Sequence, residues 1–155
     1  TGQLAWAVGN DLPARTGVAK TGIHQTNGNP YDLLDSAADI RSYIQTKLIT
    51  PLVAGQSYTF KMYVVAAYFA GNSDLLCPIT SLKNLGAHFS AVRPTNFNTN
   101  HRLNVTPQLI FNGIEFYSIP RAWVEVSGVY TATGGERYLT IGNFDYHVNF
   151  EFQNQ

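Results

Sequence analysis

The clearest pattern in the chain is an alternation of side chains over residues 56–69. Every second residue from Tyr58 to Tyr68 is apolar or aromatic and falls on one face of an extended segment. A period of two residues is typical of a β-strand. The opposite face is polar at first and turns apolar after Lys61, so we expect the later half of this strand to be covered on both sides.

Several other segments repeat this pattern between turns rich in Gly, Pro and Asn. Further strands are predicted over 40–48, 85–90, 108–111, 123–131, 137–141 and 146–152. Gly134 and Gly135 predict a hairpin turn. Residues 32–39 could form a single helical turn, and the polar segment 93–103 is expected to be a long exposed loop. About eight strands with such turns predict one all-β domain over residues 1–155, an antiparallel β-sandwich.

Apolar strands are also predicted at the two ends of the sequence, over 3–8 and within 146–152. Each places three apolar side chains on one face: Leu4, Trp6 and Val8 in the first, Val148, Phe150 and Phe152 in the second. An apolar strand must pair with another strand, in its own chain or in a neighbouring molecule. These six residues are therefore the candidate assembly positions.

Composition narrows the classes of function. Hydrophobic residues make up 45% and charged residues 13%, and ten basic residues balance ten acidic ones. This balance favours neither nucleic acid nor anionic membranes as partners, and it offers little repulsion against self-association. No apolar run is long enough to predict a membrane span. The single Cys77 excludes a disulfide within the chain. The start at Thr1 is what a processed, secreted protein would show, and a trimmed piece of a longer chain would show the same.

No catalytic motif is found. The four histidines, at 24, 88, 101 and 147, lack metal-ligand spacing, and there is no nucleophile elbow, phosphate-binding loop or dinucleotide fingerprint. Two carboxylates could still meet in space as a glycosidase pair, but ten of them in 155 residues do not indicate one. We therefore expect a binding or building module and not an enzyme.

Two kinds of ligand have candidate residues. A structural calcium ion, the one cofactor considered, would take oxygen ligands near predicted strand ends: Asp32, Asp35, Asp39, Asn143 and Asp145. The alternative for these residues is turn and cap chemistry. A glycan would stack on aromatic rings, for which the candidates are Tyr43, Tyr63 and Trp123, but most rings in such a chain are core or cross-strand residues. Asn104 also begins an N-glycosylation sequon.

Five blocks of sequence between residues 43 and 144 carry a resemblance. They cover 43–60, 85–90, 107–110, 123–132 and 134–144, and the most specific are W-x-x-V-S-G-x-Y-T-A at 123–132 and G-G-E-x-Y-L-T-I-G-N-F at 134–144. Together they resemble a galactose-binding-like jelly-roll module of bacterial secreted and cell-surface proteins, of the type found ahead of OmpA-like domains and in gliding-associated adhesins. The resemblance implies an extracellular or cell-surface location and a binding or scaffolding role.

The chain departs from that pattern in two places. Such modules usually open with an Asn-Pro-Ser-Phe-Glu-like strand well before the first Trp, but here the first Trp is already Trp6. They also usually continue after the I-G-N-F block with a long insert and a closing strand, whereas here only residues 145–155 follow that block. A sandwich short of a strand could be completed by a neighbouring subunit, and such head-to-tail contacts generate filaments. We therefore predict a subunit of a surface fibre that assembles with itself by strand exchange. The alternative is a carbohydrate-binding adhesion module.

A short modification pattern suits a bacterial surface protein of this kind. Asp35-Ser36-Ala37 matches a bacterial O-glycosylation pattern, which makes Ser36 a second candidate glycosylation site beside Asn104.

Overall fold

The structure is a computed structural model that describes residues 14–17, 21–23, 42–65, 79–82, 84–97, 102–115, 122–144 and 150–152. All regular secondary structure in these ranges is β-strand, as predicted. The strands are β1 (Ile44–Lys47), β2 (Ser57–Val64), β3 (Ile79–Leu82), β4 (Leu85–Ser90), β5 (Leu109–Phe111), β6 (Ile114–Glu115), β7 (Val124–Thr131), β8 (Tyr138–Asn143) and β9 (Phe150–Phe152). The helical turn expected over 32–39 lies outside the described residues.

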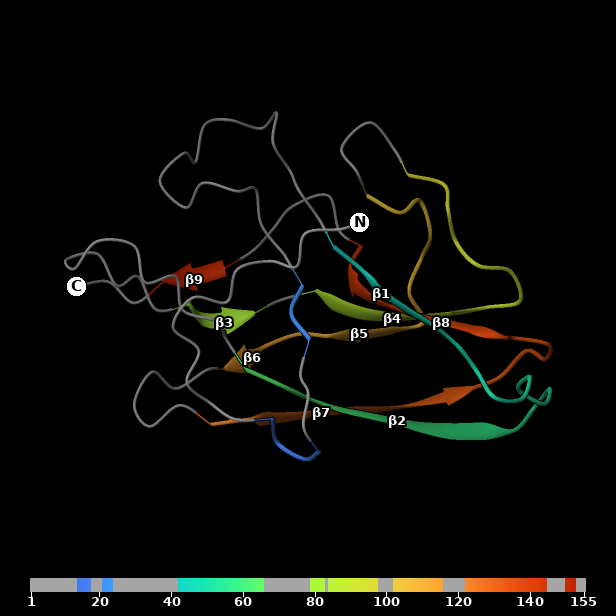
Figure 1. Ribbon diagram of the computed structural model, residues 1–155, viewed down its shortest axis with the longest axis horizontal. Helices are drawn as coiled ribbons and strands as arrows, with labels where there is room; N and C mark the ends of the chain where they lie inside the picture. The colour runs from blue at the N-terminus through green and yellow to red at the C-terminus, as the bar shows by residue number, and fades with distance from the viewer. Residues whose placement is uncertain are drawn as a thin grey trace.

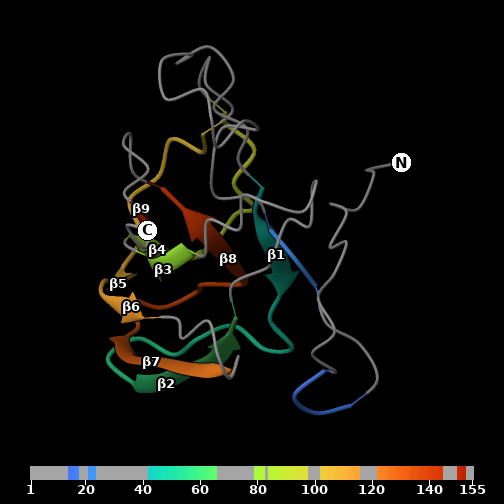
Figure 2. The same ribbon diagram turned by 90° about the vertical axis from the view of Figure 1, so that its left-hand side faces the viewer.

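Every strand pair in the described residues is antiparallel. A four-stranded sheet has the order β1-β8-β4-β5, a two-stranded ribbon pairs β2 with β7, and a third sheet has the order β6-β3-β9. In both views the ribbon runs beneath the four-stranded sheet (Figures 1 and 2). This arrangement is compatible with a β-sandwich, while the jelly-roll strand order stays a prediction.

The core lies between the ribbon and the four-stranded sheet. The ring of Phe89 in β4 stacks on that of Tyr130 in β7, with centroids 4.5 Å apart and planes only 5° from parallel. Phe60 in β2 meets Phe89 edge to face at 6.4 Å. These contacts join the two layers, and a second buried cluster around Leu85, Ile114 and Val126 continues the core toward β6.

The inner and outer faces of the ribbon follow from its register. Phe60 pairs with Gly128 and Met62 with Val126, and these positions face the core. Lys61 pairs with Ser127 and Tyr63 with Glu125 on the opposite face, which is mostly exposed. The later half of this strand is predicted to be covered on both sides, and on its second face Tyr63 and Val65 are indeed partly buried, while Ala67 lies outside the described residues.

One predicted loop is partly wrong. The sequence predicts an exposed loop over 93–103, but Phe97 and Leu103 form an antiparallel bridge and Leu103 is fully buried. The backbone N–H of Leu103 donates to the hydroxyl of Tyr43, 3.2 Å away. Because that hydroxyl supplies an acceptor for the buried N–H, this end of the segment can fold onto the sheet.

Candidate functional site

The candidate assembly residues divide into two groups. Leu4, Trp6, Val8 and Val148 lie outside the described residues. Phe150 and Phe152 lie in β9, which pairs with β3 of the same chain, Phe150 opposite Leu82 and Phe152 opposite Ile79. The backbone of this C-terminal strand is therefore paired within its own chain.

The structure brings no calcium site together among the described residues. Asn143 is buried in β8 opposite Leu85, in the middle of the four-stranded sheet. The other four candidates, Asp32, Asp35, Asp39 and Asp145, lie outside the described residues. Within the described ranges no three His, Cys, Asp or Glu side chains gather closely enough to hold a metal ion.

The three candidate sugar-stacking rings occupy different places. Tyr43 is held by its own domain: its hydroxyl donates to the backbone oxygen of Asn143 at 2.8 Å, and its ring packs against Phe144 with centroids 5.2 Å apart. Trp123 is partly buried and directly precedes β7. Tyr63 lies on the outer face of the ribbon, whereas Tyr43 packs against the four-stranded sheet, so the three rings do not form one platform.

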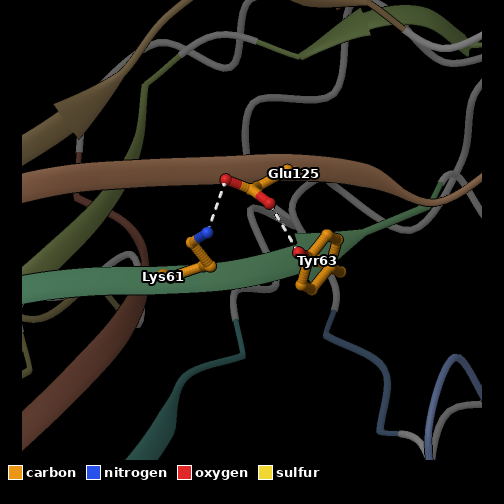
Figure 3. Close-up of polar contacts among 3 residues, drawn as sticks. All are labelled: Lys61, Tyr63 and Glu125. Carbon is orange, nitrogen blue, oxygen red and sulfur yellow. Dashed lines mark hydrogen bonds and ion pairs between the residues drawn. The ribbon is translucent and has the colours of Figure 1, made fainter.

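Tyr63 belongs to a polar cluster that the sequence did not predict (Figure 3). Its hydroxyl donates to Oε2 of Glu125 at 2.5 Å, and Nζ of Lys61 lies 3.0 Å from Oε1 of the same carboxylate. The guanidinium carbon of Arg15 lies 3.4 Å from the centroid of the Tyr63 ring, in a cation–π contact. The cluster forms because the register sets Tyr63 opposite Glu125 and leaves Lys61 on the diagonal.

The electrostatics of this cluster favour binding over proton transfer. Hydrogen bonds from Tyr63 and Lys61 lower the pKa of the Glu125 carboxyl, and the hydrogen bond and charge of Glu125 raise the pKa of Lys61. Both groups therefore stay charged at neutral pH, whereas a general acid or base works best with a pKa near the working pH. The cluster can offer a carboxylate and two cations to a polar ligand.

A second feature is an open seam between the layers. A depression of about 470 Å³ separates the β5–β6 corner from β7. It is lined by Ile110, Phe111, Asn112, Gly113, Ile114, Val124, Glu125, Val126 and Ser127. Among the described residues, β5 pairs only with β4 and β7 only with β2, so each strand has an unpaired edge there. We call this depression the seam.

The candidate glycosylation sites remain predictions. Asn104 is exposed, and its backbone N–H donates to the oxygen of Asn96 at 3.0 Å. Exposure of the side chain is a condition that an N-glycosylation site must meet. Ser36 lies outside the described residues.

No family model, curated protein or solved structure matches this chain. The resemblance to a galactose-binding-like module therefore stays a prediction from its motifs. No helix in the described part of the chain is long and apolar enough to span a membrane.

Proposed function

We propose that this chain is a non-enzymatic structural module of an extracellular fibre, which joins copies of itself by strand addition at the seam. The observation that carries the proposal is the edge of β7. It has eight residues, all paired with β2 on one side, and the first four of them, Val124 to Ser127, line the seam. In the described residues this edge has no partner strand, and an unpaired edge beside an open depression is a template for a strand from another chain.

The dimensions suit a short donor strand. Strands rise about 3.4 Å per residue, so the eight residues of β7 offer an edge of about 27 Å. Ile110, half exposed at 54%, would contact the apolar side chains of such a donor. Main-chain hydrogen bonds would supply affinity and these side chains specificity.

The N-terminal segment is the better donor of the two ends. Because β9 already pairs with β3, its residues have an intramolecular partner. Residues 3–8 alternate in the same way, and Leu4, Trp6 and Val8 would share the face that enters the seam. Six extended residues span about 20 Å, which fits within the length of β7.

The test compares two exposed aliphatic residues on different faces. Ile110→Lys would place a charge in the seam, whereas Val129→Lys would place one on the outer face of β7, where Val129 is 63% exposed. We expect negative-stain electron microscopy and light scattering to show long fibres for the wild type and the Val129 variant, and monomers for the Ile110 variant. Monomeric wild-type protein, or fibres that persist in Ile110→Lys, would overturn the proposal.

A second candidate function, carbohydrate binding, is favoured by the Glu125 carboxylate beside the Tyr63 ring, of which Arg15 covers one face and leaves the other for a sugar. Sugar sites combine an aromatic face with polar groups that fix the hydroxyls. A glycan array would then show binding that Tyr63→Ala abolishes and Val129→Ala preserves, with the melting temperature unchanged in both variants. An array without any hit would remove this candidate.

A further inference from the structure

The loops at one end of the sandwich form a distinct surface. Residues 48–56, the segment after β4 and the turn between β7 and β8 all lie at the end farthest from β3 and β9 (Figure 1). The register explains this, since Lys47 at the end of β1 and Ser90 at the end of β4 both pair with Tyr138 at the start of β8.

This end exposes aliphatic side chains. Ile49 is fully exposed, Val92 is 75% exposed and Val53 is 59% exposed. With exposed neighbours they form a set that we call the apolar tip: Ile49, Pro51, Val53, Ala54, Ala91 and Val92. Single exposed aliphatic residues are ordinary, but several on neighbouring loops are typical of an interaction surface.

The backbone of the tip is held firmly. The N–H of Leu52 donates to the oxygen of Glu136, and the N–H of Gly135 donates back to the oxygen of Leu52, each at 3.0 Å. The N–H of Val53 donates to the hydroxyl of Tyr58 at 3.0 Å. Leu52 packs against the core while its neighbours are exposed. The loop is therefore anchored by Leu52 and by backbone bonds, neither of which requires aliphatic residues at the exposed positions.

Three cations lie at the same end of the molecule as the tip. Lys47, Arg93 and Arg137 are all exposed at this end. Glu136, the single acidic residue in the described parts of these loops, is buried and hydrogen-bonded inside the turn. The chain is neutral as a whole, but in its described part this end presents three exposed cations and no exposed carboxylate.

We propose that the apolar tip docks on an anionic lipid surface, with the aliphatic side chains entering the interface and the three cations facing the headgroups. Apolar side chains ringed by Lys and Arg are typical of interfacial membrane binding. A small soluble anion would bind the cations and make no contact with the aliphatic residues. An apolar protein partner would contact the aliphatic residues and make no use of the cations. The tip lies at the start of β2, away from the seam, so this inference does not depend on strand exchange.

Vesicle flotation with the full chain tests the inference, because fibres sediment by themselves but float only when bound to lipid. The probes are vesicles of phosphatidylcholine alone and of phosphatidylcholine mixed with phosphatidylglycerol. We expect the wild type to float with the anionic vesicles, with binding that weakens as salt rises. The double variant Ile49→Ser/Val92→Ser should bind at least tenfold more weakly, whereas Val129→Ser should bind like the wild type.

Charge reversal gives the second arm. Lys47→Glu/Arg137→Glu should lose binding to anionic vesicles by more than tenfold, since each cation near such a surface contributes about fivefold. The proposal is overturned by failure of the wild type to float with anionic vesicles, by equal binding to neutral vesicles, or by full competition from inorganic phosphate. It is also overturned if Val129→Ser weakens binding as much as the tip variant. Ile110→Lys should float like the wild type, which separates this result from that of strand exchange.

Discussion

The hydroxyl of Tyr130 in β7 donates a hydrogen bond of 2.6 Å to Oε1 of Glu136, six positions further along the chain. The same oxygen accepts from the backbone N–H and the hydroxyl of Thr133, and Oε2 accepts from the N–H of Gly134. Glu136 is 3% exposed, so one buried carboxylate joins the stacked rings of the core to the turn that supports the apolar tip. The Glu of the G-G-E block thus has a structural role within its own turn.

Stability should depend on the ionisation of Glu136. Burial would raise the pKa of this carboxyl, but hydrogen bonds from Tyr130 and Thr133 outweigh burial and lower it from 4.5 to about 2. Because the folded pKa lies below the unfolded one, the carboxylate stabilises the fold above about 4.5 and loses that contribution as the pH falls toward 2. We expect urea midpoints to fall across this window in the wild type.

The variant Glu136→Gln should remove most of this dependence. The neutral amide is a weaker acceptor than the carboxylate for the hydrogen bonds from Tyr130, Thr133 and Gly134. We expect this variant to lower the free energy of unfolding by about 2 kcal/mol at neutral pH. Glu125→Gln is the matched control, because that carboxylate is exposed and should matter little for stability. Equal pH profiles for the wild type and Glu136→Gln would contradict the assignment.

Gly142 should tolerate no side chain. It lies in β8 opposite Gly86, and a Cβ at this position would overlap the ring of Tyr43. Gly142→Ala must displace that ring, which should cost about 1–3 kcal/mol. Calorimetry should show a lower melting temperature for Gly142→Ala and almost no change for Gly22→Ala, where an added Cβ meets nothing within 4 Å.

The sequence predicted the strands better than their partners. Alternation alone located β2 and β7, because one face of each is more buried than the other along most of its length. It missed β3 and β6, which are only four and two residues long and carry no clear period. Short strands are defined by the neighbours that pair with them, and those neighbours lie far away in the sequence.

The same limit applies to the candidate surfaces. The sequence indicates Tyr63 as a candidate through its ring, but the carboxylate partner Glu125 lies 62 positions away, and the register of β2 and β7 brings the two together. Ile49 and Val92 carry side chains that are usually buried, so composition gave no reason to expect them exposed. The equal numbers of basic and acidic residues likewise gave no indication that Lys47 and Arg137 lie at one end without an exposed carboxylate among the described residues there.

Deleting residues 1–8 should prevent assembly without unfolding the domain. The proposed donor would be lost, while every described strand pair would remain. Light scattering should then report monomers with a wild-type melting temperature. Deleting 146–155 is the contrasting variant: it removes the β9 partner of β3 and should lower the melting temperature. Fibres formed by the chain without residues 1–8 would exclude this segment as the donor.

A synthetic peptide with the sequence of residues 1–10 should compete for the seam. If Leu4, Trp6 and Val8 enter the seam, the free peptide should bind the chain lacking residues 1–8 and shorten wild-type fibres in proportion to its concentration. A peptide with Trp6→Ser should bind at least tenfold more weakly, because Trp buries the largest apolar area of the three. Peptide binding should also be lost in Ile110→Lys and kept in Val129→Lys, because Ile110 lines the seam and Val129 does not. A peptide that binds both variants equally would show that it occupies another surface, and the donor strand would then have to pair elsewhere than along β7.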